Sequence, residues 1–143
     1  MDAFDAAGIE VPSHFLQPGD YTIISGRESA QFLLTSKRKR PTAIVAANDI
    51  SAIGVIECAR ELGLRVPEDL SVTGFDDLSP AHEHGLFLTT IHQPVREIGT
   101  VAAKALLKSI QKGESLGGHV DVDVALVVRS STGPVPKQAP AGA

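Results

Sequence analysis

Between residues 41 and 93 the chain alternates short apolar segments with amphipathic ones, and this alternation is the feature that most constrains its fold. The segments at residues 42–46, 70–75 and 88–92 read as strands, and their mostly apolar composition is typical of parallel strands buried on both faces. Apolar residues recur every three or four positions over residues 51–62, which predicts an amphipathic helix. Strand alternating with helix predicts an open, mostly parallel, doubly wound α/β sheet with helices on both faces, a Rossmann-like lobe.

The flanking segments extend this pattern. Ser25 and Glu28 have the spacing of a capping box at a helix start, and that helix leads into the four cations at residues 37–40. These cations complement the negative end of the helix dipole, an interpretation we prefer to a nucleic-acid patch. Pro94 opens a further helix at a position where its missing N–H costs nothing. The apolar face of that helix comprises Val95, Ile98, Ala102, Ala105, Leu106 and Ile110. Residues 120–128 suit an edge strand that runs into a buried one.

Composition agrees with a single domain. The chain has 143 residues, 43% of them hydrophobic and 21% charged, which is enough for one core. The net charge of −4 argues against this segment gripping DNA, because that affinity comes mostly from Lys and Arg neutralising phosphates. The single cysteine, Cys58, cannot form an internal disulfide, and no apolar run approaches the roughly 20 residues that span a bilayer. We expect a cytoplasmic domain over residues 1–132 and a proline-containing disordered tail over residues 133–143.

Polar side chains follow each predicted strand. Asn48 and Asp49 come after the first, Asp76 and Asp77 after the second, and Gln93 closes the third. In open parallel sheets, ligands bind in the crevice beyond the carboxyl ends of the strands. Because an ionised carboxylate accepts several charge-assisted hydrogen bonds, the acidic pair could hold sugar or ribose hydroxyls; alternatively it caps a turn or pairs with an arginine. Asn48 could read a ligand or only cap the helix.

Four blocks of sequence resemble the effector-binding domain of lactose-repressor-type (LacI/GalR) transcription regulators, in the same order and at about the same spacing. They are Ala47-Asn48-Asp49, LRVPEDLSVTGFDD at residues 64–77, LTTIHQP at residues 88–94 and VVRSST at residues 127–132. The resemblance implies the carboxyl-terminal lobe of a two-lobed, periplasmic-binding-protein-like sensor. It also implies a homodimer in which a small effector alters DNA binding by a separate helix-turn-helix domain outside this chain.

The resemblance also ranks the candidate effector-binding residues. It implies that Asp76 contacts the effector, that Asn48 commonly faces it, and that Asp49 is the helix cap. Tyr21 stands where the family often carries an aromatic ring that stacks on the effector, although a lone tyrosine is more often a half-buried packing residue. Gln93 is a weaker candidate. This polar set suits a sugar, but related sensors bind purines with similar residues.

Two further features concern partners and metals. His82, Glu83 and His84 suggest zinc, but two histidines without a third ligand in view make a weak site, so we expect no metal. The resemblance places this loop near a subunit interface, which makes His84 a candidate dimer contact. Ile53 and Ile56 are candidates for either the core or the same interface.

Two other functions compete with the sensor. An enzyme or phosphoacceptor domain would use Asp76 and Asp77 as an acidic pocket, with a magnesium ion and usually a lysine at a later strand end. His92 and Gln93 stand there instead, and the chain lacks a glycine-rich phosphate loop, so we expect no catalysis and no cofactor. A periplasmic sugar-binding protein would share the two-lobed shape, but the start of the chain does not read as a secretion signal.

Overall fold

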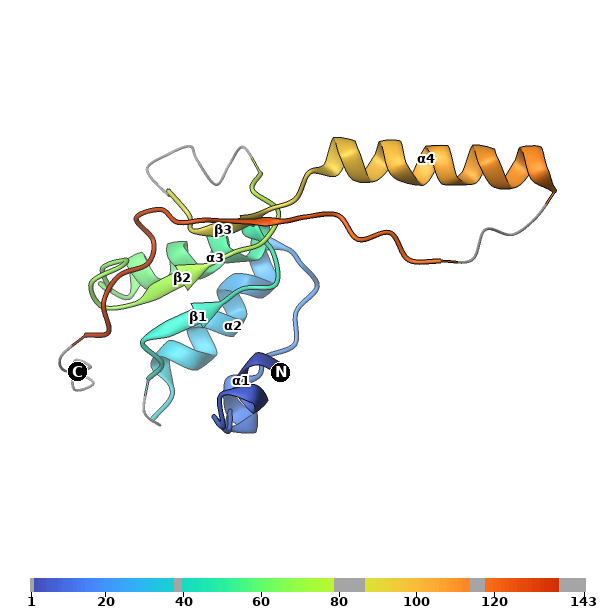
Figure 1. The fold of residues 1–143 in the computed structure, drawn as a ribbon. Helices are drawn as coiled ribbons and strands as arrows, with labels where there is room; N and C mark the ends of the chain where they lie inside the picture. Colours follow the sequence, from blue (N-terminus) through green and yellow to red (C-terminus); the bar gives the residue numbers. More distant parts are fainter. Residues whose placement is uncertain (1, 38–39, 79–86, 114–117, 137–143) are drawn as a thin grey trace.

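A computed structural model describes residues 2–37, 40–78, 87–113 and 118–136. Its elements in chain order are α1 (Asp2–Ala6), a 3-10 helix (Ser13–Phe15), α2 (Ile23–Thr35), β1 (Ala43–Val45), α3 (Asp49–Glu61), β2 (Ser71–Thr73), β3 (Thr90–His92), α4 (Val95–Lys112) and β4 (Ala125–Val127). Figure 1 shows α2 and α3 together beside the strands, whereas α4 extends away from them. Among the described residues, no helix is long and apolar enough to cross a membrane.

The three predicted central strands are parallel, as their apolar composition indicated. β1 pairs with β2 in parallel register, Ala43 opposite Ser71 and Val45 opposite Thr73. Isolated parallel bridges, one joining Thr73 to Thr89, then connect the β2 segment with the β3 segment. β4 runs antiparallel to β3. The observed strands are shorter than predicted, but their order along the chain and their parallel direction are confirmed.

The core lies between the α2–α3 layer and the strands, and it is aliphatic, as the low aromatic content requires. Its fully packed members are Ala30, Leu34, Ala52, Val55, Ile56, Cys58, Ala59, Leu70, Val72 and Leu88. Burial raises the pKa of the Cys58 thiol, because the charged thiolate is poorly solvated there. Cys58 is therefore a packing residue of the core rather than a reactive nucleophile.

Two glycines let α2 and α3 touch at their amino-terminal halves. A methyl group on Gly54 would overlap the carbonyl of Ile23 in α2, and one on Gly26 would overlap the backbone of Ser51 in α3. The contact is thus reciprocal, and only residues without a Cβ allow it. It brings the first turns of the two helices side by side, and with them the segment before α2 and the loop that follows β1.

The helix starts differ from the predicted ones. The N-cap of α2 is Thr22, whose side chain accepts a hydrogen bond from the Ser25 amide, so the capping box predicted to begin at Ser25 is wrong. Ser25 has the matching spacing but stands three positions inside the helix. In α3 the N-cap is Asn48, within a capping box completed by Ser51, and Asp49 is the first helical residue rather than the cap.

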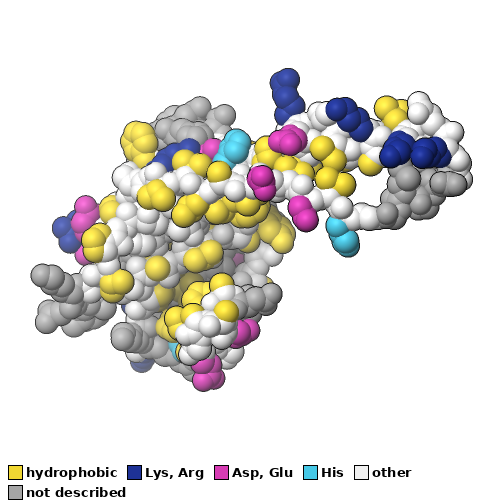
Figure 2. All heavy atoms as spheres, viewed as in Figure 1, with side chains coloured by type: hydrophobic (Ala, Val, Ile, Leu, Met, Phe, Trp, Pro, Cys, Tyr) yellow, Lys and Arg dark blue, Asp and Glu magenta, His cyan; other side chains and the backbone are white. Residues whose placement is uncertain are grey.

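The amphipathic helix predicted after Pro94 forms as α4 and ends at Gly113 in the left-handed conformation, with φ of 67°. It does not cover the sheet as predicted, because it leaves the strands directly after β3 and none of its residues is buried. The apolar side chains of α4 therefore lie at the surface (Figure 2). The buried half predicted for the last strand is also wrong, since β4 is mostly exposed. Within the described residues, α2 and α3 cover only one face of the sheet.

Replacing Gly54 with alanine tests the helix contact. We expect a loss of about 1–3 kcal/mol in the free energy of unfolding, because the added methyl group overlaps the Ile23 carbonyl and outweighs the helix-propensity gain of about 1 kcal/mol. Gly99→Ala in α4 is the matched control, because nothing lies within 4 Å of its Cβ position. It should stabilise the protein by up to about 1 kcal/mol. Urea unfolding measures both; equal effects would contradict the contact.

Candidate functional site

The polar residues that follow β1, β2 and β3 meet at one edge of the sheet. The Asp49 amide donates to the Phe75 carbonyl at 2.8 Å, which joins the loop after β1 to the loop after β2. The Asp76 amide donates to the Ile91 carbonyl at 3.0 Å, which joins the loop after β2 to β3. The parallel direction of the strands thus places three loops, distant in sequence, in one polar corner.

Asp76 and Gln93 form the centre of this corner. The Gln93 side-chain amide donates to Oδ1 of Asp76 at 2.6 Å, and both residues are half-buried. The other carboxylate oxygen of Asp76 accepts no hydrogen bond from the part of the chain that the structure describes. Gln93 therefore fixes the carboxylate in one orientation and leaves one oxygen as an acceptor for a ligand.

Asp77 has different partners from its neighbour. Its carboxylate accepts from Nη2 of Arg129 at 2.6 Å and lies 2.9 Å from Nδ1 of His92. Arg129 also donates to the Leu88 carbonyl at 2.7 Å. Both Asp77 and Arg129 are largely buried, so the arginine-pairing alternative holds for this carboxylate.

Asn48 and Tyr21 are brought together by the contact between the two helices. Oδ1 of Asn48 accepts from the Ser51 amide at 2.9 Å, and its Nδ2 donates to the Tyr21 carbonyl at 3.2 Å. Both ends of the Asn48 side chain are thus already used within the protein. Tyr21 has φ of 67°, a backbone conformation that is uncommon outside glycine. The residue is 65% exposed. Its ring is accessible rather than half-buried in packing.

The turn that carries Tyr21 is held by the residue before it. Oδ1 of Asp20 accepts from the amide and the hydroxyl of Thr22 at 3.1 and 2.6 Å. Hydrogen bonds from the side chains of Ser25 and Thr22 hold the pKa of the Asp20 carboxyl at about 2. The carboxylate is therefore ionised at neutral pH and keeps its hold on the turn.

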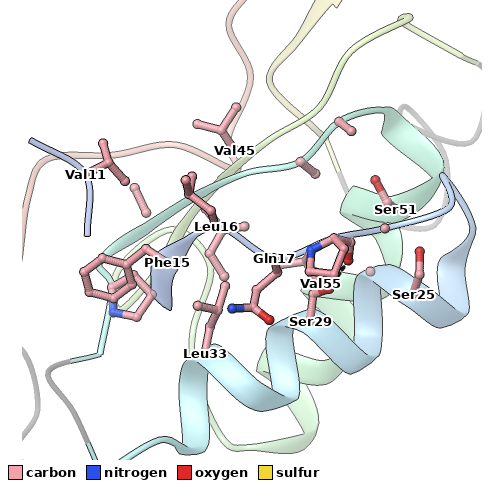
Figure 3. A pocket seen from close by; sticks show the side chains of 18 of the residues that line it. Val11, Phe15, Leu16, Gln17, Ser25, Ser29, Leu33, Val45, Ser51 and Val55 are labelled. Atoms are coloured by element: carbon pink, nitrogen blue, oxygen red, sulfur yellow. Dashed lines mark hydrogen bonds between the residues drawn. The ribbon is translucent and has the colours of Figure 1, made fainter. Parts of the chain in front are cut away.

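Two hollows adjoin the corner. One has a volume of about 460 Å³ and mostly apolar walls, with Phe15 and Leu16 facing Leu33 of α2 (Figure 3). It reaches Tyr21 but not Asp76. The other, of about 590 Å³, is lined by Gln93 and the first turn of α4. No three His, Cys, Asp or Glu side chains within the described ranges come together to hold a metal ion.

The remaining predicted site residues have different outcomes. His82, Glu83 and His84 lie outside the described residues. Ile56 belongs to the core cluster with 1% exposure, which favours the core alternative for this residue. Ile53 is also buried, with 8% exposure, but is not part of that cluster.

Two polar residues that hold the strands and the corner together were not predicted from the sequence. One is Arg129, described above. The other is Ser131, 1% exposed, whose hydroxyl donates to the Val72 carbonyl at 2.6 Å and accepts from the Thr89 amide at 2.8 Å. Both lie in the VVRSST block, where polar residues directly after an apolar run were the available signal.

Comparison with known proteins agrees with this architecture. A family model described as a periplasmic binding protein-like domain matches residues 1–132. The chain is 39% identical over 131 residues to the HTH-type transcriptional repressor PurR of Klebsiella pneumoniae, covering 92% of this chain and 38% of that protein. Among solved structures, a LacI-family regulatory protein from Chloroflexus aggregans matches with a TM-score of 0.80 and 32% identity, over 92% of this chain and 47% of that one.

A LacI-family transcriptional regulator from Enterococcus faecium, with bound ribose, matches with a TM-score of 0.79 and 32% identity, over 93% of this chain and 49% of that one. The fold and the matches define the class: this is a periplasmic-binding-protein-like domain. Within that class, the chain belongs to the effector-binding domains of LacI/GalR-type transcription regulators. It spans 38% of the length of the PurR relative.

Replacing Arg129 with methionine should destabilise the protein by about 3 kcal/mol, because it removes the guanidinium that pairs with the largely buried Asp77 carboxylate. Arg27→Met is the matched control. Arg27 pairs with Glu61, but both side chains are about half exposed, at 44% and 57%, so water replaces the lost partner. Its cost should be at most about 1 kcal/mol. Chemical unfolding compares the two variants. Equal losses in the free energy of unfolding would show that the Arg129–Asp77 pair stabilises the protein no more than an exposed pair does.

Proposed function

We propose that this chain is the carboxyl-terminal sensing lobe of a cytoplasmic LacI-type transcription regulator, and that its polar corner binds a small sugar or related polyol. The observation that carries the proposal is the Asp76 carboxylate, held by Gln93 through one oxygen and open at the other. The matched regulator from Enterococcus faecium with bound ribose supports a sugar as the effector class. A purine is the second candidate, because the exposed Tyr21 ring could stack on a base.

In this proposal each residue has a separate task. Asp76 accepts hydrogen bonds from effector hydroxyls, which are strong because the acceptor is charged. Tyr21 offers its exposed ring to the apolar face of the effector. Gln93 orients Asp76, and Asn48 holds the Tyr21 loop and caps α3. The residues act by binding alone, without a chemical step.

Binding acts on DNA through a second lobe and a helix-turn-helix domain outside this chain. An effector that contacts both lobes favours the relative lobe orientation in which its contacts are complete. By linkage, that preference changes DNA affinity by the same free energy with which it distinguishes the two orientations. The corner of this lobe thus sets which effector the protein senses.

Asp76→Ala should shift the effector response to higher effector concentrations while leaving operator binding intact. The substitution leaves a ligand hydroxyl without its acceptor, so effector affinity should fall by about 1–3 kcal/mol. Calorimetry of the full-length protein with a panel of sugars and purine bases measures affinity, and operator release measures the response.

Asp121→Ala is the control, because Asp121 is an exposed carboxylate distant in sequence from the corner. It should bind and respond as the wild type does. If Asp76→Ala kept the full wild-type affinity, Asp76 would not be an effector contact. Turnover of a phosphorylated substrate would favour the enzyme alternative.

A homodimer is the second part of the proposal. Ile53 is buried but lies outside the core cluster, and the next residue, Gly54, touches the backbone of Ile23. Ile23 and Ile24 are 39% and 68% exposed, so large apolar side chains reach the surface close to Ile53. Association through this region would cover them.

Ile53→Ala should weaken dimerisation of the full-length protein, whereas Ile56→Ala should lower stability without changing the dimer dissociation constant. Both variants lose the same side-chain atoms, so they differ only in location. Analytical ultracentrifugation at micromolar concentrations gives the dissociation constants, and urea unfolding gives the stabilities. A monomeric wild-type protein, or equal effects of the two variants on association, would contradict the proposed interface.

A further inference from the structure

Asp49 is the only fully buried carboxylate among the described residues, and the effector-binding role uses none of its atoms. Its Oδ1 accepts from the Thr90 hydroxyl at 2.5 Å, and its Oδ2 accepts from the Leu78 amide at 2.8 Å. Both donors are neutral. Burying a carboxylate costs free energy even when it is hydrogen-bonded. The burial of Asp49 is therefore accounted for by the groups that it holds in place.

Asp49 binds both ends of the part of the corner that carries the acidic pair, residues 75–78. Its backbone amide donates to the Phe75 carbonyl at 2.8 Å, at the start of the corner, and its side chain accepts from the Leu78 amide at the end. In an ordinary four-residue turn, the first carbonyl and the fourth amide often bond to each other. Here both groups bind to Asp49 instead. One residue of α3 therefore fixes the two ends of the loop after β2.

The corner needs such a hold because its backbone is strained. Asp76 and Asp77, the two residues between the bracketed ends, have φ of 117° and 60°. Residues with a side chain rarely adopt these conformations, and they persist only where the surroundings impose them. Gly74 also makes room for the carboxylate, because a Cβ at that position would overlap Oδ1 of Asp49.

The geometry points to Asp49 and Thr90 as positioning residues for effector recognition: together they hold residues 75–78 in the conformation that presents Asp76. This inference rests on the proposed function of the corner. Both residues have 0% exposure, so neither touches the effector, and their effect passes through Asp76. Thr90 belongs to β3 and anchors the Asp49 side chain to the sheet.

The first arm of the test needs no ligand. Hydrogen exchange of the Leu78 amide is followed in the full-length protein for wild type, Asp49→Asn, Thr90→Val and Thr90→Ser. Asp49→Asn and Thr90→Val should speed exchange by about tenfold, the effect of losing one hydrogen bond to a charged group. Thr90→Ser keeps the hydroxyl and should restore the wild-type rate. Unchanged exchange in Asp49→Asn and Thr90→Val would overturn the positioning role.

The second arm measures effector affinity by calorimetry in a double-mutant cycle. Thr90→Val should weaken binding of the preferred sugar by about tenfold in the wild-type background and leave it unchanged in the Asp76→Ala background, because its effect passes through Asp76. Ile56→Val, a core variant that lowers stability without touching the corner, should keep wild-type affinity.

The outcomes separate the two claims. Equal losses from Thr90→Val in both backgrounds, or an equal loss from Ile56→Val, would show a general effect on folding and overturn the positioning role. If the wild type bound none of the sugars or purines but Leu78 exchange responded as expected, Asp49 and Thr90 would hold the corner as inferred. The proposed function alone would then fail.

Discussion

The close approach of α2 and α3 is the contact on which the rest of the structure depends. Gly26 and Gly54 remove the side chains that would keep the helices apart, so the first turns of the two helices meet. Because each helix starts at a polar cap, this contact also brings Asn48 against the Tyr21 loop. The same helix contact therefore supports the core and places Asn48 against Tyr21, and a change that separates the helices would disturb both.

The polar corner combines two kinds of carboxylate with different environments. Asp49 is fully buried and accepts hydrogen bonds from two neutral donors, whereas Asp77 is largely buried and contacts Arg129 and His92. Asp76 stands between the ends that Asp49 fixes, is oriented by Gln93, and keeps an oxygen open. Burying the carboxylates of Asp49 and Asp77 costs desolvation free energy, but their hydrogen bonds keep the loop rigid. Selective recognition of a small polar molecule requires a rigid loop of this kind. In the proposed function, Asp49 and Asp77 support the loop and Asp76 binds the effector.

Sequence patterns predicted the parallel strands, the helices between them and the polar corner, because apolar periodicity and strand-end polarity are local properties. They could not distinguish Thr22 from Ser25, or Asn48 from Asp49, as caps, since neighbouring residues of similar chemistry satisfy the same pattern. Arg129 was missed because its pairing with Asp77 joins residues 52 positions apart. The exposure of α4 was also unpredictable, because an amphipathic face indicates burial without naming the partner that provides it.

A crystal structure of the full-length protein with the sugar that releases it from DNA would test the central claim most directly. The account predicts a sugar hydroxyl at a hydrogen-bond distance of about 2.5–3.0 Å from the open oxygen of Asp76, with the sugar against the Tyr21 ring. It also predicts that the corner at residues 75–78 keeps the backbone described here. A sugar bound without contact to Asp76, for example in the apolar hollow between Leu16 and Leu33, would contradict it.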